Sequence, residues 1–277
     1  MISGRTAVFG VLGHPVAHSL SPAMHNAAYR AAGIDAVYVP LPAAPERLAE
    51  GIRGAHALGF RGLNVTVPHK QRAADLCERL DTVAALCGAV NTLRRTEAGW
   101  EGFNTDAPAC LALLEEAGVR RGARGLVLGA GGAALAAAWA LLRAGLEVEV
   151  AARRGAAAEA LCGRMRAAFR DGPAARAVAW TDVAGRAAGA EVVVNATSVG
   201  LAGHGGGLPA FRFRRRHLAV DFVYGETAFV EQARADGAAV VTGEQILVRQ
   251  GALAFTIWIG QPAPEAVMAA ALHETGT

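Results

Sequence analysis

A glycine-rich turn between an apolar strand and an alanine-rich helix constrains the fold of this chain most strongly. Residues 125–129 have the length and composition of a buried strand, and an alanine-rich helix follows as far as Gly145. A second strand, residues 147–151, returns after that helix. This order predicts a βαβ unit whose turn and helix N-terminus bind the pyrophosphate of a dinucleotide. The turn consists of Gly129, Ala130, Gly131, Gly132 and Ala133.

The residues after the second strand indicate which dinucleotide binds. A site for NAD has an acidic residue here, which accepts hydrogen bonds from the ribose hydroxyls. This chain has Arg153 and Arg154 instead, and its next acid is Glu159. Because guanidinium groups bind phosphate through charge-assisted hydrogen bonds, we expect NADP, with Arg153 and Arg154 holding its 2′-phosphate. The alternative is that both arginines are solvated in a loop.

Strands and helices alternate along the chain. Runs with strand composition cover residues 6–12, 36–41, 62–67, 89–93, 191–195, 218–223 and 238–241. Helical patterns follow several of them, among them residues 45–58, 107–117, 244–259 and 264–272. This alternation predicts the α/β class with mainly parallel sheets. The length of 277 residues allows two ordinary domains.

A lysine follows the strand expected at residues 62–67. Alternation in that strand predicts that Val65 and Val67 are buried on one face, with the polar Asn64 and Thr66 on the other. A proline at the first helical position would then start a helix with Lys70 in its first turn. A cation is unfavourable at the positive end of a helix dipole. Lys70 therefore indicates either a nearby anion or proton transfer, the alternative being a solvated surface lysine.

Hydroxyl groups near another expected helix start indicate an anion site. Ser21 precedes Pro22, so the simplest interpretation of Ser21 is a helix cap. Ser19 lies beside the same helix N-terminus, where hydroxyls and free N–H groups form a receptor for a small carboxylate. Asp106 similarly precedes an expected helix, and a helix cap is the structural alternative for it.

Composition limits the other function classes. The formal net charge is +3 and no run of like charge is longer than Arg214-Arg215-Arg216, which argues against nucleic-acid binding. The four cysteines have no metal-ligand or disulfide spacing, so we expect no metal site and reduced thiols in a cytoplasmic protein. We expect no secretory signal and no membrane span. The pattern leaves the choice between monomer and homodimer open.

Several stretches, taken together, resemble the shikimate dehydrogenase family. They are residues 19–22 (SLSP), 64–70 (NVTVPHK), 89–92 (AVNT), 104–106 (NTD), 129–133 (GAGGA), 195–198 (NATS) and 250–255 (QGALAF). They extend over nearly the whole chain in the order typical of that family. The series is more specific than a glycine turn, which many unrelated dinucleotide enzymes share.

The resemblance implies two α/β domains with a cleft between them. A substrate-binding domain with a mainly parallel sheet would comprise residues 1–106 and 242–277. A Rossmann-type NADP domain would comprise residues 107–241. The implied activity is an NADP-dependent interconversion of shikimate and 3-dehydroshikimate, in the biosynthesis of chorismate and the aromatic amino acids.

The resemblance also implies roles for individual residues. Lys70 would be the catalytic acid/base, with Asp106 holding the substrate hydroxyl and orienting the lysine. Substrate would be bound by Ser19 and Ser21 at its carboxylate and by Asn64, Thr66, Asn91, Tyr224 and Gln250 elsewhere. Beyond the glycine turn and the two arginines, the residues implied to contact NADP are Asn195, Thr197, Ser198, Val223 and Gly243.

Three positions depart from the pattern usual in that family. Thr82 replaces a frequent acid, Ala152-Arg153-Arg154 replaces Asn-Arg-Thr, and Glu244-Gln245 occupies a turn that usually contains glycine. The last departure borders the region expected to contact the nicotinamide.

Rival functions are a dehydrogenase of quinate or an aminoshikimate and, from another class, a nucleotide-binding protein without turnover. The presence of both Lys70 and Asp106 argues against the latter.

Overall fold

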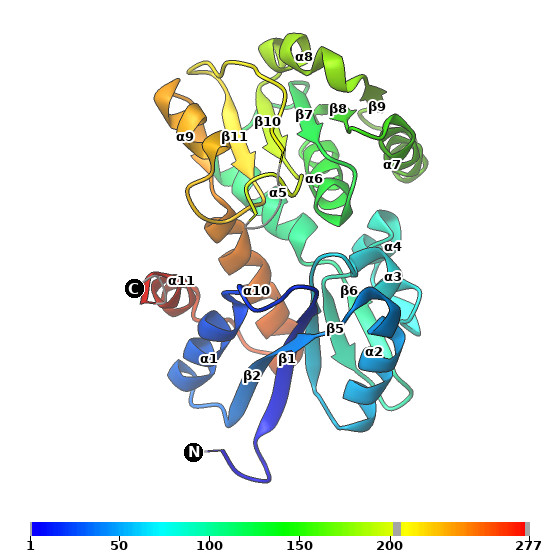
Figure 1. Ribbon diagram of the computed structural model, residues 1–277, viewed down its shortest axis with the longest axis vertical. Helices are drawn as coiled ribbons and strands as arrows, with labels where there is room; N and C mark the ends of the chain where they lie inside the picture. Colours follow the sequence, from blue (N-terminus) through cyan, green and yellow to red (C-terminus); the bar gives the residue numbers. More distant parts are fainter. Residues whose placement is uncertain (1, 202–205, 275–277) are drawn as a thin grey trace. The chain divides into compact units, whose positions relative to one another are not determined.

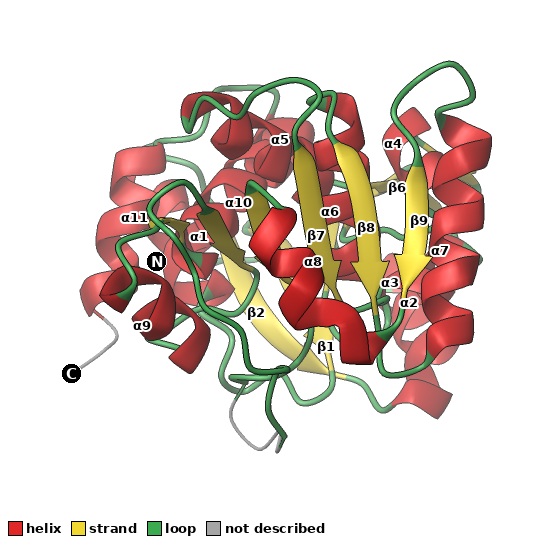
Figure 2. Ribbon diagram, turned by 90° about the horizontal axis from the view of Figure 1, so that it is seen from above, coloured by secondary structure: helices red, strands yellow, loops and turns green. Residues whose placement is uncertain are grey.

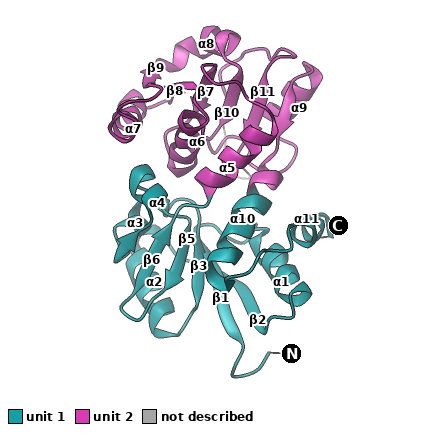
Figure 3. Cartoon of the chain, turned by 180° about the vertical axis from the view of Figure 1, so that it is seen from behind, with its two compact units in different colours: residues 1–105, 247–277 teal, residues 106–246 magenta. Residues whose placement is uncertain are grey.

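The computed structural model describes residues 2–201 and 206–274. The chain divides into two compact units, shown in separate colours in Figure 3. Unit 1 consists of Met1–Thr105 and Leu247–Thr277, and unit 2 of Asp106–Ile246. Each unit has its own six-stranded sheet with helices, which confirms the α/β class. Figure 1 labels the elements in chain order.

The sheet of unit 1 is mixed, with the strand order β2-β1-β3-β5-β6-β4. Strands β2 and β3 both run parallel to β1, whereas β5 is antiparallel to both β3 and β6. The expectation of a parallel arrangement therefore holds for only part of this sheet. The strands are β1 (Ala7–Gly13), β2 (Ala36–Pro42), β3 (Gly62–Val65), β4 (Arg79–Leu80), β5 (Thr92–Arg95) and β6 (Trp100–Phe103).

Helices cover both faces of this sheet. One core contains Leu12, Leu63 and Val65 with side chains of α2. On the other face Phe9 and Tyr38 pack with Phe255 and residues of α1, α10 and α11. The helical elements are α1 (Ser21–Ala31), η1 (Pro45–Arg47), α2 (Leu48–Ala57), α3 (Lys70–Ala74), α4 (Thr82–Cys87), α10 (Gly243–Ile259) and α11 (Glu265–Glu274).

The sheet of unit 2 is parallel throughout, with the order β12-β11-β10-β7-β8-β9. Figure 2 shows β7, β8 and β9 pointing the same way. The order of the strands reverses beside β7: β8 and β9 follow on one side of it, and β10, β11 and β12 follow on the other. Doubly wound sheets bind ligands at such a reversal, here between β7 and β10. The strands are β7 (Arg124–Leu128), β8 (Glu147–Ala151), β9 (Ala175–Val178), β10 (Val192–Asn195), β11 (Leu218–Asp221) and β12 (Ala239–Val241).

Helices accompany this second sheet between successive strands. The glycine turn leads from β7 into α6, as the sequence predicted, and β8 follows. The elements are α5 (Asp106–Glu116), α6 (Gly132–Arg143), α7 (Gly155–Ala168), η2 (Trp180–Asp182), α8 (Val183–Gly189) and α9 (Ala228–Ala235). No helix in the described part of the chain is both long and apolar enough to cross a membrane.

Three local expectations about unit 1 were wrong. Strand β3 ends at Val65, so Val67 lies beyond the sheet and its exposure is 49%. Helix α3 begins at Lys70 with His69 as its cap, so Pro68 precedes the helix instead of starting it. Helix α1 begins at Ser21 itself and its cap position is Leu20, which leaves Ser21 without a capping hydrogen bond.

Candidate substrate and cofactor sites

A buried polar network begins at Asn64 in β3. Asn64 Nδ2 donates to the backbone oxygen of Asn91 and to Thr92 Oγ1, each at 3.1 Å. Its Oδ1 accepts from the hydroxyl of Tyr38 at 2.7 Å. Asn64 is paired in register with Val11 and therefore faces the α1 and α10 side of the sheet. An amide this deeply buried is stable only because its polar atoms have partners.

The network continues through Asn91 to the helix α10. Asn91 Nδ2 donates to Thr105 Oγ1 at 2.8 Å and to Gln250 Oε1 at 3.1 Å. Asn91 Oδ1 accepts from the backbone N–H of Thr105 at 2.7 Å. Gln250 Nε2 donates to the backbone oxygen of Leu247. Three of the predicted substrate residues, Asn64, Asn91 and Gln250, thus belong to one connected network in unit 1.

The two predicted carboxylate residues lie at the N-terminus of α1. Ser19 is half-buried, and its Oγ accepts from the backbone N–H of Ser21 at 3.3 Å. Ser21 is buried; burial raises the pKa of Tyr38, and the Ser21 side chain opposes that rise. Ser21 is the first residue of α1 and forms no capping hydrogen bond there.

Thr66 and Lys70 follow β3. Thr66 is partly buried, and a Cβ on Gly13 would overlap its methyl group. The glycine at position 13 therefore allows the Thr66 side chain to lie against the backbone there. Lys70 is half-buried at the first position of α3, and its backbone oxygen accepts from Val90 N at 2.9 Å. That bond ties α3 to the residues that precede Asn91.

Asp106 begins helix α5, at the first residue of unit 2. Its exposure is 5%. One turn further along the helix, burial and the nearby Asp106 carboxylate raise the pKa of Cys110 to about 12. An aspartate buried at a helix start is favourably placed relative to the helix dipole.

The glycine turn of unit 2 fits a dinucleotide. Gly129 has φ of +116°, and a Cβ there would lie 2.6 Å from the backbone oxygen of Ala196, so the position requires glycine. Gly131 is the cap residue of α6, and a Cβ there would meet nothing within 4 Å. The turn thus leads directly into a helix N-terminus, whose N–H groups are the kind of site that binds pyrophosphate.

Both arginines predicted to bind phosphate follow β8. Arg153 and Arg154 are exposed, and Arg154 is the cap residue of α7. Neither forms an ion pair within the residues that the structure describes. Their guanidinium groups are therefore available for an anion beside the strand that follows the glycine turn.

The turn after β10 is held by a buried aspartate. Asn195 Oδ1 accepts from Thr197 Oγ1 at 2.7 Å, and Asn195 Nδ2 donates to Asp221 Oδ1 at 2.9 Å. Asp221 Oδ1 also accepts from Val223 N at 3.0 Å, and its Oδ2 accepts from Thr227 Oγ1 at 2.6 Å. Burial raises the pKa of Asp221 to about 6. Asp221 therefore fixes two predicted cofactor segments at adjacent strand ends. Ser198, in the same turn, is partly buried.

The last predicted residues of unit 2 lie around the start of α10. A Cβ on Gly243 would overlap the backbone oxygen of Val223, so glycine allows these two segments to meet. Tyr224 is partly buried, and burial, followed by the Glu244 carboxylate, raises the pKa of its phenol. Glu244 Oε1 accepts from the backbone N–H of Gly225. The departure at Glu244 thus ties the loop after β11 to α10.

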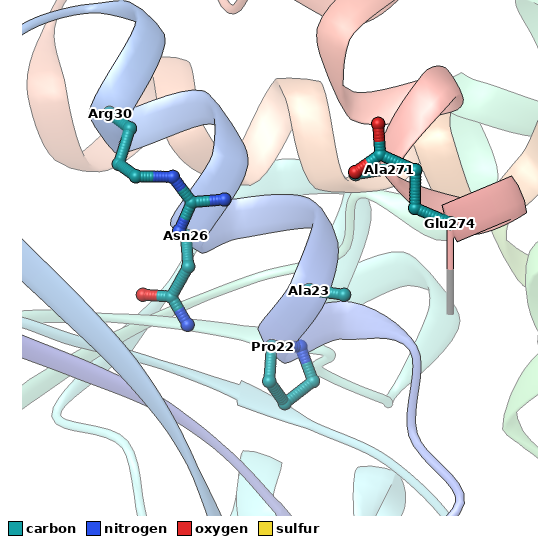
Figure 4. A pocket seen from close by; sticks show the side chains of 6 residues that line it. All are labelled: Pro22, Ala23, Asn26, Arg30, Ala271 and Glu274. Carbon is teal, nitrogen blue, oxygen red and sulfur yellow. The ribbon is translucent and has the colours of Figure 1, made fainter.

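A separate hollow of about 290 Å³ lies between α1 and α11 (Figure 4). None of the predicted site residues lines it. Its lining consists of Pro22, Ala23, Asn26, Arg30, Ala271 and Glu274. Among the described residues, no group of three His, Cys, Asp or Glu side chains is arranged to bind a metal ion.

Four residues of these networks were not among the predicted site residues. Thr92 and Thr105 stand inside stretches typical of the family, so the motif itself was the signal that located them. Asp221 is a lone acid at the end of an apolar strand, which weakly indicates a polar role for it at that edge of the sheet. Tyr38 stands in an apolar run, where an aromatic residue is most often part of the core.

Comparisons with known proteins agree with this arrangement. Residues 11–93 match the family model described as the shikimate dehydrogenase substrate binding domain, and residues 243–273 match that of the shikimate 5′-dehydrogenase C-terminal domain. A protein of Anaeromyxobacter sp. (strain K) named shikimate dehydrogenase (NADP(+)) is 64% identical over 273 residues. The match covers 99% of this chain and 98% of the relative.

Solved structures extend the comparison. A crystal structure of a shikimate dehydrogenase in complex with NADP+ has a TM-score of 0.90 and 34% identity, covering 100% of this chain and 98% of that one. The shikimate 5-dehydrogenase of Thermus thermophilus in complex with NADP(H) and shikimate has a TM-score of 0.84 and 39% identity, covering 97% of this chain and 99% of that one. This chain therefore belongs to the shikimate dehydrogenase family.

Proposed function

We propose that this chain catalyses the NADP-dependent interconversion of shikimate and 3-dehydroshikimate, with Lys70 and Asp106 handling the proton of the reacting hydroxyl. The observation that carries this function is the match, over nearly the full length of both chains, to a relative with that activity in its name. The glycine turn that requires Gly129 supports the cofactor. The reaction belongs to the biosynthesis of chorismate and the aromatic amino acids.

Oxidation of a secondary alcohol needs a group that takes the hydroxyl proton. When bound, NADP supplies the hydride acceptor in one direction and the hydride donor in the other. Lys70 accepts the hydroxyl proton as the hydride leaves, and returns it in the reverse reaction. Asp106 holds the hydroxyl beside Lys70 and keeps the lysine oriented by accepting a hydrogen bond from its ammonium group.

The hydrogen bonds that Asn64 already forms determine whether it donates to the substrate or accepts from it. Both Nδ2 hydrogens of Asn64 are already donated to Asn91 and Thr92, and Oδ1 accepts from Tyr38. Only acceptor capacity on Oδ1 remains for a ligand, so Asn64 accepts a hydrogen bond from a ring hydroxyl. Ser19 and Ser21 bind the carboxylate. The other proposed substrate contacts are Thr66, Asn91, Tyr224 and Gln250.

The cofactor is held by unit 2 in this proposal. Residues 129–133 receive the pyrophosphate, and Arg153 with Arg154 receives the 2′-phosphate. The segments that contain Asn195, Thr197, Ser198, Val223 and Gly243 contact the rest of NADP. This assigns the NADP-binding role to residues 107–241 and the substrate-binding role to residues 1–106 and 242–277.

A cytoplasmic location and a monomer or homodimer complete the proposal. Free thiols support the location, because Cys77, Cys87, Cys110 and Cys162 form no disulfide.

A steady-state assay of the purified chain tests the function. Shikimate and quinate are each measured with NADP and with NAD, and formation of the reduced nicotinamide is followed. We expect shikimate with NADP to have the highest kcat/KM, with NADP preferred over NAD by at least about tenfold. Higher kcat/KM with quinate would assign the chain to the rival substrate. Absence of turnover with every pair would favour a binding protein.

A further inference from the structure

A second buried contact lies behind the proposed substrate residues. Tyr38 stands in β2, the edge strand of the unit 1 sheet, and Asn64 stands in β3, with β1 between them. The tyrosine side chain crosses β1, and its hydroxyl donates to Asn64 Oδ1 at 2.7 Å. Tyr38 and Asn64 have exposures of 1% and 5%, so this bond is shielded from water.

The phenolic hydroxyl of Tyr38 has a single hydrogen, and Asn64 Oδ1 receives it. Burial, followed by Tyr29, raises the pKa of Tyr38, so the phenol stays protonated and able to donate. The direction of the bond from Tyr38 to Asn64 is therefore fixed.

Tyr38 is held firmly enough to position its neighbours. The side chain of Asn26 on α1 donates to the backbone oxygen of Tyr38 at 2.8 Å and accepts from its N–H at 2.9 Å. The ring of His25 stacks on the Tyr38 ring, with centroids 4.5 Å apart and planes within 9°. These contacts fix both the backbone and the ring plane, so the hydroxyl has little freedom.

The backbone oxygen of Asn91 fixes the orientation of the Asn64 amide, and the Tyr38 hydroxyl matches that orientation. Asn64 Nδ2 faces the backbone oxygen of Asn91, which can only accept, so Oδ1 must face Tyr38. With the phenolic hydrogen as its partner, Oδ1 has acceptor capacity left for one ring hydroxyl. Without that hydrogen, Oδ1 would be buried with an unmet hydrogen bond, a state that costs more than losing an exposed one.

We propose that Tyr38 is a positioning residue for the substrate, which holds the Asn64 side chain ready to accept a hydrogen bond from a ring hydroxyl. The proposal rests on the proposed function, because it takes shikimate as the ligand of Asn64. The phenolic hydrogen satisfies one acceptor site of Asn64 Oδ1 before the substrate binds, so the amide keeps its place when the ring hydroxyl donates to the same oxygen.

Tyr38→Phe tests this proposal by removing only the hydroxyl. We expect KM and the directly titrated Kd for shikimate to rise about five- to tenfold, the loss typical of one hydrogen bond, with kcat changed less than about twofold. The Kd for NADP should stay near wild type, while the thermal midpoint should fall modestly because Asn64 Oδ1 loses a buried partner. An unchanged Kd for shikimate would overturn the proposal, as would a fall in thermal midpoint with normal shikimate binding.

Tyr29→Phe is the matched control. Tyr29 has 1% exposure and belongs to the same core cluster, but its hydroxyl has no hydrogen-bond partner. Its removal should leave the Kd for shikimate unchanged. An equal rise in Kd in both variants would show a general effect of the core and would overturn the specific role of Tyr38.

A double-mutant cycle with Asn64→Ala tests whether Tyr38 acts through Asn64. If it does, the Kd for shikimate of the double variant should exceed that of the poorer single variant by no more than about twofold. Multiplication of the two separate effects would overturn this role of Tyr38. Turnover of shikimate by the wild-type enzyme tests the proposed function by itself, so failure of either claim can be told from failure of the other.

Discussion

Arg153 and Arg154 are the two residues proposed to determine cofactor choice. They are exposed and follow β8, and an acid in that place would select the ribose hydroxyls of NAD. The features that indicated them, namely the glycine turn and the strand that precedes them, are local in the sequence. The sequence was therefore sufficient to select both arginines as candidates for phosphate binding. Their proposed contact with the 2′-phosphate stays a prediction.

Arg153→Ala should raise KM for NADP by about tenfold or more, because hydrogen bonds to a charged group contribute about 1.5–3 kcal/mol. KM for NAD, which lacks the 2′-phosphate, should hardly change. Arg164→Ala, which removes an exposed arginine from α7, is the matched control and should affect neither cofactor. Equal losses with both cofactors would assign Arg153 a structural role instead.

The burial of His25 makes the free energy of unfolding depend on pH. The side chain is fully buried, neither ring nitrogen has a hydrogen-bond partner, and burial lowers its pKa to about 3. Between about pH 3 and 6.5 the unfolded chain therefore binds a proton at this residue and the folded chain does not. The stability that neutral His25 provides is present above about pH 6.5 and is lost as the pH falls below it.

Between about pH 7 and pH 5, His25 alone should lower the free energy of unfolding by about 2 kcal/mol. In His25→Leu the difference between the two pH values should be smaller than in wild type by about that amount. Urea unfolding of both proteins at both pH values measures this. An identical difference in the two proteins would show that His25 gains a partner when it is protonated.

Residues that depend on distant partners could not be predicted from the sequence. Tyr38 contacts Asn64 only because β1 lies between their strands, and nothing in the run around Tyr38 distinguishes it from core. Asp221 likewise fixes Asn195 across two neighbouring strands. The motifs contain Asn64, Asn91 and Gln250, which the structure joins in one buried network, but they did not predict the direction in which each amide bonds. The contact of these residues with substrate stays a prediction.

At the scale of elements, local pattern predicted most of the strands but not all of their ends. Val67 continues the alternation of Val65, yet β3 pairs with β5 only through Gly62–Asn64 and ends at Val65. Strand β6 was not predicted because it contains Glu101 and Gly102. Glu101 is buried there only because Arg79 and Arg94 on neighbouring strands bond to its carboxylate.

Helix α10 begins with a capping arrangement that explains one departure from the family. The backbone N–H of Thr242 donates to Gln245 Oε1 at 2.9 Å, and Gln245 N donates to Thr242 Oγ1 at 3.4 Å. This reciprocal pair is the capping box, whose sequence signal is threonine followed three residues later by glutamine. Gln245 therefore has a structural role in starting the helix.

Thr242→Ala should lower the free energy of unfolding by about 1 kcal/mol, because it removes the cap. Thr256→Ala on the same helix is the control. The Thr256 hydroxyl donates back to the Ala252 oxygen at 3.0 Å, a bond that adds little to helix stability, so its loss should be near neutral. Urea unfolding of both variants measures the difference, and equal losses would contradict the capping role.

At the scale of the whole molecule, the two units provide different parts of the proposed chemistry. Unit 1 contains the Asn64–Asn91–Gln250 network and Lys70, and unit 2 contains the glycine turn and Asp106. The order of motifs along the chain predicted that both parts exist. Their combination into one reaction is the central claim, because neither the lysine nor the nucleotide turn oxidises an alcohol alone.

Asp106→Asn keeps size and polarity but removes the charge proposed to orient Lys70. If the two residues act as one unit, kcat of the double variant with Lys70→Ala should be little lower than that of the slower single variant. Independent roles predict that the two losses add in free energy. The kcat values of the wild type and the three variants decide between these mechanisms.

The most direct test of the central claim is kcat of Lys70→Ala for shikimate oxidation with NADP. Lys70 is half-buried at the start of α3, so its truncation should leave the fold and NADP binding intact. Loss of a general acid/base predicts that kcat falls by about two to four orders of magnitude, while KM for shikimate changes less. A folded, NADP-binding Lys70→Ala enzyme with near-normal kcat would contradict the claim.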